Sequence, residues 1–395
     1  MPRSWCARIL AGVLVLAAAG CAPSRSSSPG PSPVSPVSQR SAPLMPTLSS
    51  DHVPTRTAAA LQAVLEKWVD GGHAPGATAA VVSADGIWSG AAGVDGMDTK
   101  LVPEAVMAIA SITKTFVAAE VMLLSAQGLV DLDAPLADYV AMPFDDRGAT
   151  VRQTLGMLSG FPDVPHVKLA ATTGPDPHRR WTPQEVLDLI DVDAPRLGFV
   201  GMSQHYSNLN YILLGMLVEQ VTGDPLAVAL RWDLLEPAGL DRVAVQDAER
   251  PQRPLARAAR GREERWIDPA GEYLPSLTQA TVAGAAGGMA GDAPAIARWG
   301  YLLYGGYVID TGLVEQMTNG EGEDDWYGLG TMRWERDGGL VVGHSGGLEG
   351  YHGLLAVWPE GATSVAVLVP QSRPLVIDVS IETVADQLYD AAHLG

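Results

Sequence analysis

One helical segment constrains this chain more than any other part of it. Residues 108–124, AIASITKTFVAAEVMLL, predict a helix that is apolar on nearly every side and is therefore enclosed by other elements. Ser111 and Lys114 stand three positions apart in this segment, so a helix places both side chains on one face, with Cβ atoms about 5–6 Å apart. Only four of the 26 basic residues are lysines. A lysine in such surroundings needs a partner or a task.

The Ser-x-x-Lys pair suits nucleophilic catalysis. A serine hydroxyl becomes reactive when a nearby base takes its proton. Lys114 lies among Ile112, Phe116 and Val117, and desolvation by such neighbours lowers a lysine pKa enough for the amine to be that base. The alternative is that Ser111 only caps the helix while Lys114 extends its stem toward solvent. This segment alone does not decide between the two interpretations.

Two later segments carry polar groups that fit the same chemistry. The sequence YSN at 206–208 precedes an apolar helical run. A tyrosine beside a lysine can share a proton with it, so that the two titrate as a unit, and the amide of Asn208 can hold both a substrate carbonyl and a lysine. The sequence HSGG at 344–347 precedes a strand, where a backbone N–H can contribute to an oxyanion hole. Each of these motifs is common by itself.

The hydrophobic pattern predicts strands and a helix at each end of the folded region, with a mainly helical insert at about 130–270. One antiparallel sheet flanked by helices, with the insert as a second lobe, accommodates this order. The expected strands are Ala77–Ala84, Ile87–Val94, Tyr351–Trp358 and Ser364–Val369. The expected helices are residues 61–69, the segment from Ser111 to Gly128, Thr182–Val192, Asn208–Val221, Pro225–Leu235 and Ile381–Ala392.

In chain order, Ser-x-x-Lys, Tyr-x-Asn and His-x-Gly resemble the motifs of the serine β-lactamase and penicillin-binding-protein superfamily. The similarity is greatest to the branch of class C β-lactamases, D-alanyl-D-alanine carboxypeptidases and related esterases. It runs from about Pro54 to the C-terminus and includes QTLGMLSGFPD (153–163), YSNLNYILLG (206–215), LLEPAGL (234–240), AAGGMAGDAPAIARWGYLLYGG (285–306) and GHSGGLEGYHGLLAVWPEG (343–361). The resemblance implies an α+β fold of the β-lactamase/transpeptidase type, with an antiparallel sheet flanked by helices and an all-helical lobe.

The resemblance also implies a role for each matching residue. Ser111 would be the nucleophile that forms an acyl-enzyme, and Lys114 with Tyr206 would be the proton-transfer pair. Asn208 would orient the substrate amide. The N–H groups of Ser111 and Gly347 would form the oxyanion hole.

His344 is a departure from the β-lactamase pattern. It would occupy the place of the lysine in the Lys-Thr-Gly triad, and a neutral imidazole does not supply that lysine's permanent charge. The resemblance therefore favours a D-alanyl-D-alanine carboxypeptidase-like or esterase-like hydrolase. A weak β-lactamase and a catalytically silent binding lipoprotein of the same fold are the alternatives.

The N-terminus predicts export and anchoring. Residues 1–20 carry two arginines and then an apolar run, which is typical of a signal peptide. Ala18-Ala19-Gly20-Cys21 resembles a bacterial lipobox, so Cys21 is the expected lipidation site; plain secretion is the alternative. A Pro/Ser-rich linker follows over 21–52, and the hydrolase domain is expected over 53–395. We therefore expect an extracytoplasmic protein that is lipid-anchored at the cell envelope.

Composition and motif spacing exclude several other classes of function. A net charge of −19 argues against a nucleic-acid partner. The scattered histidines predict no metal site, and no phosphate-binding loop or other cofactor motif is present, so the expected partner is a small-molecule or peptide substrate. Gly343–Gly347 also matches Gly-x-Ser-x-Gly, the nucleophile elbow of α/β-hydrolases, with Asp378 and His393 following in the required order. That elbow requires a helix after Ser345, whereas this sequence predicts a strand.

Overall fold

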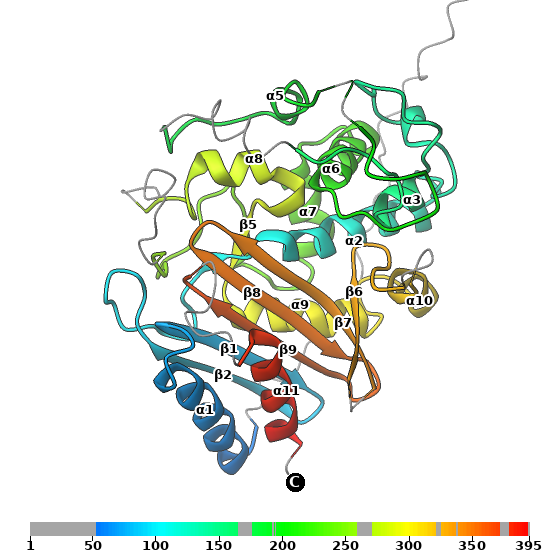
Figure 1. Cartoon of the computed structure of the whole chain (residues 1–395). Coiled ribbons are helices and arrows are strands. Elements are labelled where there is room, and N and C mark those ends of the chain that lie inside the picture. Colours follow the sequence, from blue (N-terminus) through cyan, green and yellow to red (C-terminus); the bar gives the residue numbers. More distant parts are fainter. Residues whose placement is uncertain are drawn as a thin grey trace, which may run out of the picture. The chain divides into compact units, whose positions relative to one another are not determined.

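A six-stranded antiparallel sheet forms the base of the molecule, with strand order β2-β1-β9-β8-β7-β6 (Figure 1). A second sheet has three short strands in the order β3-β5-β4. The computed structural model describes residues 53–164, 176–191, 193, 195–258, 271–320, 325–336, 339–371 and 379–393, all within one compact unit. The predicted signal segment, Cys21, the linker and Asp378 lie outside the described residues.

The strands are β1 (Gly76–Ser83), β2 (Gly86–Gly93), β3 (Met107–Ala108), β4 (Ala244–Val245), β5 (Met289–Gly291), β6 (Met332–Arg336), β7 (Gly339–Leu348), β8 (Tyr351–Trp358) and β9 (Thr363–Val369). The α-helices are α1 (Thr55–Asp70), α2 (Thr113–Ala126), α3 (Val151–Leu155), α5 (Pro183–Leu187), α6 (Asn208–Thr222), α7 (Leu226–Leu230), α8 (Leu277–Gly287), α9 (Ala293–Tyr304), α10 (Thr311–Thr318) and α11 (Ile381–Ala392). Short helical turns are η1 (Ala110–Ile112), η2 (Leu136–Asp138) and the π-type turn η3 (Arg231–Leu235).

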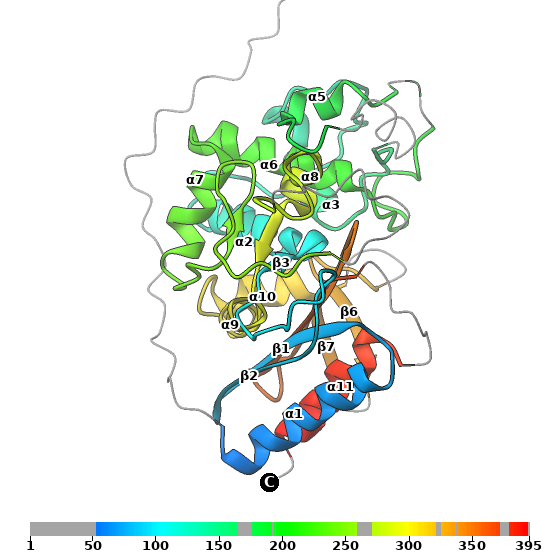
Figure 2. The same ribbon diagram turned by 90° about the vertical axis from the view of Figure 1, so that its left-hand side faces the viewer.

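Alternation along the strands gives the large sheet two buried faces. Ala79 of β1 and Val367 of β9 pack with α1 and α11, whereas Ala80 and Ala366, one position away, belong to the core on the other side. Helices α1 and α11 contact each other (Figure 2). Helix α9 packs against β1, β8 and β9 from the opposite face. The predicted arrangement of an antiparallel sheet flanked by helices is confirmed.

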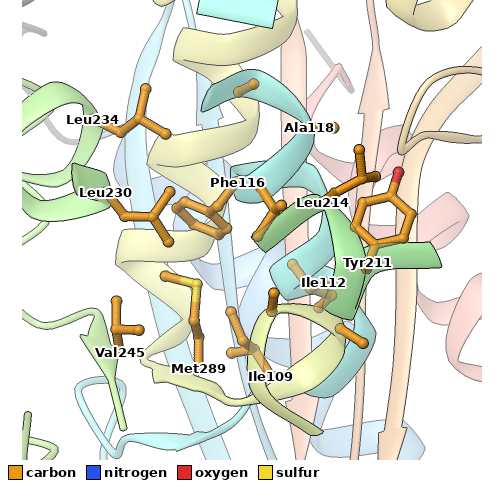
Figure 3. Close-up of a cluster of buried hydrophobic side chains, with 14 of the residues drawn as sticks. Ile109, Ile112, Phe116, Ala118, Tyr211, Leu214, Leu230, Leu234, Val245 and Met289 are labelled. Atoms are coloured by element: carbon orange, nitrogen blue, oxygen red, sulfur yellow. The ribbon is translucent and has the colours of Figure 1, made fainter. Parts of the chain in front are cut away.

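Helix α2 runs through the core between the sheet side and the helical lobe. Every residue from Thr113 to Leu124 is buried, as the apolar pattern predicted. The ring of Phe116 stacks on Trp299 of α9 with centroids 4.1 Å apart, and the Trp299 indole donates to Thr115 Oγ1 at 2.9 Å. In Figure 3 Phe116 lies beside Leu230 of α7, within the same hydrophobic core. These contacts fix the helix that presents the reactive pair.

Helices α6 and α8 approach each other closely because a glycine stands at their contact. A Cβ at Gly215 would lie 2.5 Å from the Ala285 Cβ, well inside van der Waals contact.

Among the described residues, no single helix is long and apolar enough to span a membrane. Helix α6 and the run Leu226–Leu235 are long and apolar enough only when taken together, and they are bent by 77° relative to each other.

The structure adds elements to the predicted ones and shortens others. Strands β6 and β7 were not predicted, because β7 is rich in glycine and β6 ends in charged residues; the short strands β3, β4 and β5 and helices α3, α8, α9 and α10 were not predicted either. The helix predicted over Thr182–Val192 is only Pro183–Leu187. The helix predicted from Ser111 begins as a 3₁₀ turn, with regular α-helix from Thr113. The other predicted strands lie within one residue of those observed.

Candidate active site

A cavity of about 390 Å³ is lined at one end by the turn η1, which leads into α2. Helices α6 and α8, the loops before α6 and the end of β7 supply its walls. It is lined by Ala110, Ser111, Asp163, Val164, Tyr206, Asn208, Ile212, Gln279, Val282, Ala283, Ala286, Gly287, Gly347 and Leu348. The cavity therefore brings together four of the predicted site residues, namely Ser111, Tyr206, Asn208 and Gly347.

Ser111 occupies the turn that leads into α2. It is half-buried, while Ala110 before it and Ile112 after it are enclosed. Ala110 has φ +47°, a left-handed conformation that disfavours a side chain by about 1–2 kcal/mol. The neighbouring hydrogen bond from Ile109 N to Met289 O, at 3.1 Å, helps to hold the strained turn. Such strain is found where a protein fixes a reactive side chain.

Lys114 lies fully enclosed beneath Ser111, with no solvent exposure. Its Nζ is 3.1 Å from Ser111 Oγ, 2.9 Å from Asn208 Oδ1 and 2.6 Å from the Ala286 carbonyl oxygen. Burial lowers the Lys114 pKa to about 7, against a smaller opposing effect of the Asp163 charge. A substantial share of the protein therefore has a neutral amine at neutral pH.

The three hydrogen-bond partners of Lys114 determine how a neutral amine at this position is oriented. A neutral amine has two N–H donors and one lone pair. The oxygens of Asn208 and Ala286 can only accept, so they take the two donors. The lone pair is then left for the Ser111 hydroxyl, which donates to it. Lys114 is thus placed as a base for Ser111.

Tyr206 reaches Ser111 from another side of the cavity. A hydrogen bond joins the two hydroxyl groups, but burial outweighs it and raises the Tyr206 pKa well above its ordinary value. The phenol is accordingly neutral and can donate a proton. Lys114 Nζ lies 4.9 Å from the centroid of the Tyr206 ring, so the lysine faces the ring and both groups meet at Ser111. The predicted coupled titration of the two remains a prediction.

Asp163 is a cavity residue to which the sequence analysis assigned no role. Its Oδ1 accepts from Asn208 N at 2.8 Å, and its Oδ2 lies 3.4 Å from Asn208 Nδ2. These bonds turn the Asn208 amide so that Oδ1 faces Lys114. The sequence could have drawn attention to Asp163, because this residue ends the segment QTLGMLSGFPD. Nothing in that segment shows that Asp163 contacts Asn208.

His344 is separated from the cavity that it was predicted to serve. It has no solvent exposure and is not among the cavity-lining residues. Its Nδ1 lies 2.5 Å from the Ser345 carbonyl oxygen, which can only accept, so Nδ1 carries the proton. Nε2 then accepts from Tyr327 Oη at 3.0 Å. Burial, aided by the charge of Lys114, lowers the His344 pKa to about 3.

The end of β7 closes the cavity against the nucleophile. A Cβ on Gly346 would lie 2.2 Å from the Ile109 carbonyl oxygen and 3.2 Å from Ser111 N. Only a glycine lets the strand come this near to the turn. Gly347, the next residue, is exposed and lines the cavity with Ser111. This placement is compatible with the predicted oxyanion pair, whose role remains a prediction.

The Gly-x-Ser-x-Gly alternative does not form a nucleophile elbow. Ser345 lies inside β7, which turns directly into β8 instead of a helix. Its hydroxyl donates to Met332 Sδ at 3.5 Å, and His393 Nε2 contacts Thr363 Oγ1 at 3.3 Å.

In the part of the chain that the structure describes, no group of three or more His, Cys, Asp or Glu side chains could hold a metal ion.

The sequence matches one family model and several curated proteins of the same family. A family model described as Beta-lactamase matches residues 61–388. Penicillin-binding protein 4* of Bacillus subtilis is 24% identical over 62% of this chain and 56% of its own length. D-aminopeptidase of Brucella anthropi is 28% identical over 64% of this chain and 47% of its own. The chain thus spans about half of each relative.

Solved structures extend the match to most of the described fold. A D-stereospecific amidohydrolase from Streptomyces sp. superposes with a TM-score of 0.70 at 26% identity, over 87% of this chain and 99% of the other. The D-amino acid amidase of Ochrobactrum anthropi SV3 superposes with the same TM-score at 22% identity, over 85% and 98%. The second match shows the fold alone.

Proposed function

The chain belongs to the beta-lactamase family, and we propose that it is a serine hydrolase that cleaves amide bonds through an acyl-enzyme on Ser111. The observation that carries this proposal is the arrangement of Lys114 Nζ, 3.1 Å from Ser111 Oγ, with its other two contacts made to oxygens that only accept. A base with a pKa of about 7 is suited to proton transfer near neutral pH.

Acylation follows from this arrangement. The neutral amine of Lys114 takes the hydroxyl proton as Ser111 Oγ bonds to the substrate carbonyl carbon. Negative charge develops on the carbonyl oxygen, and in this proposal the N–H groups of Ser111 and Gly347 donate hydrogen bonds to it. The phenol of Tyr206, which is hydrogen-bonded to Ser111, gives its proton to the leaving amine and receives in turn the proton held by Lys114. Hydrolysis repeats the sequence with water in place of the amine.

The substrate class that best fits is a small amide or peptide with a D-residue on the acyl side. The names of the D-aminopeptidase and of the D-stereospecific amidohydrolase, both with 26–28% identity, support this choice. The penicillin-binding protein match supports the wider class of acyl-enzyme chemistry. A D-alanyl-D-alanine carboxypeptidase or an esterase is the second candidate, favoured by the motif resemblance.

Intact mass spectrometry tests the acyl-enzyme. The full chain is exposed separately to a fluorophosphonate and to benzylpenicillin, beside Ser111→Ala. We expect the fluorophosphonate adduct on the wild type alone. A penicillin adduct that persists indicates penicillin-binding character, and rapid hydrolysis indicates a β-lactamase. Absence of any adduct on the wild type would favour a silent binding protein and contradict the proposal.

We also propose that the hydrolase acts at the cell envelope, anchored through lipid on Cys21. The support is the signal-like segment at 1–20 and the cysteine directly after it. Phase partition of the full chain in Triton X-114, beside Cys21→Ser, checks this. The wild type should enter the detergent phase and the variant should remain in the aqueous phase; equal partition would contradict anchoring.

A further inference from the structure

The charge of the cavity narrows the substrate class further. Among the described residues that line it, Asp163 is the one with a formal charge at neutral pH. We propose that the Asp163 carboxylate binds the free α-ammonium group of the substrate, so that the enzyme acts on amino-acid amides and on peptides with a free N-terminal residue. This inference rests on the proposed amide hydrolysis at Ser111.

Within the described residues, the hydrogen bonds of Asp163 leave one oxygen available. Oδ1 accepts from two backbone N–H groups, those of Val164 and Asn208, each at 2.8 Å. The contact of Oδ2 among these residues is a long one, 3.4 Å from Asn208 Nδ2. A carboxylate has about four acceptor positions, and the half-buried side chain lines the cavity. Oδ2 can therefore accept a strong bond from an ammonium group.

The position of Asp163 suits an α-amino group. The carboxylate holds Asn208, Asn208 holds Lys114, and Lys114 reaches Ser111, so a short chain of hydrogen bonds joins the two ends of the site. In an amino-acid amide the α-nitrogen is two bonds from the carbonyl carbon that Ser111 attacks. Asp163 and Ser111 line the same cavity, so an amino-acid amide held there by its ammonium group on Asp163 has its carbonyl in the cavity with the nucleophile.

The rest of the described site offers no cation for a substrate carboxylate. Lys114 is enclosed, does not line the cavity, and has a pKa of about 7. His344 is enclosed and neutral. A β-lactam or a peptide with its free carboxylate in this cavity would meet the like charge of Asp163. The same feature that attracts an ammonium group disfavours carboxylate substrates.

Three p-nitroanilides test this on the unmodified protein. They share the acyl group CH₃–CH(X)–CO in the D-configuration, with X as ammonium, hydroxyl or carboxylate. Ammonium and hydroxyl differ in charge at nearly the same size, so we expect kcat/KM to be about 30-fold or more higher for the ammonium compound than for the hydroxyl compound. The carboxylate compound should be the poorest. A wild-type preference for the hydroxyl or carboxylate compound would overturn the inference.

The pH profile supplies a second readout. Activity on the ammonium compound should fall above about pH 8, where an α-amino group loses its proton. The hydroxyl compound should show no such fall. Lys114 and Tyr206 are the titratable groups beside Asp163 and Ser111, and their effects are common to both compounds. Profiles that coincide at high pH would contradict binding of the ammonium form.

Asp163→Asn removes the charge and keeps an oxygen for the N–H groups of Asn208 and Val164. The ratio of kcat/KM between the ammonium and hydroxyl compounds should fall at least about tenfold. The control is Asp188→Asn, which removes an exposed carboxylate just after α5 that accepts from Gln184 and should keep the wild-type ratio. An equal loss on both compounds would show a purely structural role for Asp163.

Binding without turnover separates this inference from the proposed function. In the Ser111→Ala background, D-alaninamide should bind about tenfold more weakly after Asp163→Asn, by titration calorimetry. If the wild type releases no nitroaniline but this difference is present, the proposed hydrolysis fails and the recognition stands. If nitroaniline is released but the difference is absent, the hydrolysis stands and the recognition fails.

Discussion

The two walls of the site bury ionisable groups with opposite results. On the helical wall, Lys114 is enclosed, and its pKa falls from 10.5 to about 7. On the strand wall, His344 of β7 is equally enclosed, and its pKa falls from 6.5 to about 3. Desolvation is the largest cause in both cases, and the two falls are similar in size. The ordinary pKa of each group therefore decides which of the two can exchange a proton at neutral pH.

The largest expected effect is that of Lys114→Met. It removes the base, replaces it with an apolar side chain of similar length, and leaves the Asn208 and Ala286 oxygens without this donor. We expect kcat on a neutral p-nitrophenyl ester to fall by about 10²–10⁴-fold. In the wild type, activity should rise with pH through about 7, because only the neutral amine accepts the Ser111 proton. Stopped-flow rates from pH 5 to 9 measure both effects.

Lys100→Met is the matched control, because Lys100 is exposed. It should keep the wild-type rate and profile. Two results would contradict the role of Lys114 as the base. One is a Lys114→Met variant with more than a tenth of wild-type activity, and the other is a wild-type pH profile that is flat through pH 7.

The second effect concerns stability at acid pH. His344 has a pKa of 6.5 when unfolded and about 3 when folded. Between these values the unfolded chain binds the proton and the folded chain does not, so the free energy of unfolding falls as pH falls from 6.5 toward 3. In His344→Gln this fall should be shallower, by up to about 1.4 kcal/mol per pH unit. Urea unfolding at pH 7.5, 5.5 and 4.5 provides the measurement.

The control for the acid series is His178→Gln, because His178 is exposed; its slope should match that of the wild type. Should His344→Gln instead lose stability as steeply as the wild type, His344 would not be the buried neutral group that distinguishes the strand wall.

The smallest expected effect is that of Ser345→Ala. The side chain is half-buried, and among the described residues its hydroxyl bonds to the sulfur of Met332, at 3.5 Å, a weak acceptor. We expect kcat/KM for the same ester to stay within about twofold of wild type, beside Ser111→Ala, which should be inactive. If kcat/KM of Ser345→Ala fell by about 100-fold, Ser345 of β7 would take part in catalysis and the prediction would be wrong.

The helical wall was predictable from local pattern, and the strand wall was not. Ser111 and Lys114 share a face because of helical spacing, and burial follows from the apolar residues around them. The meeting of Lys114 with Asn208 joins residues 94 positions apart. The motif resemblance, and not periodicity, predicted it.

The missed residues belong to loops and to irregular strands. Tyr327 meets His344 only because the loop before β6 folds back on β7. The glycines of β7 conceal the alternation that identifies a strand, so the burial of His344 could not be foreseen from the sequence. Asp163 was in view, but its partner Asn208 lies across the fold. Long-range pairing of this kind leaves no local signal.

The strand order has a consequence for how the chain acquires its structure. Strand β1 pairs with β2 on one side and with β9 on the other, so that Thr78 stands opposite Leu368. The hairpin of β1 and β2 is local, whereas the other edge of β1 has no partner until β9, the last strand described, reaches it. Closing so long a loop slows folding. Until then the hairpin holds an open strand edge, which is a site for pairing with another chain.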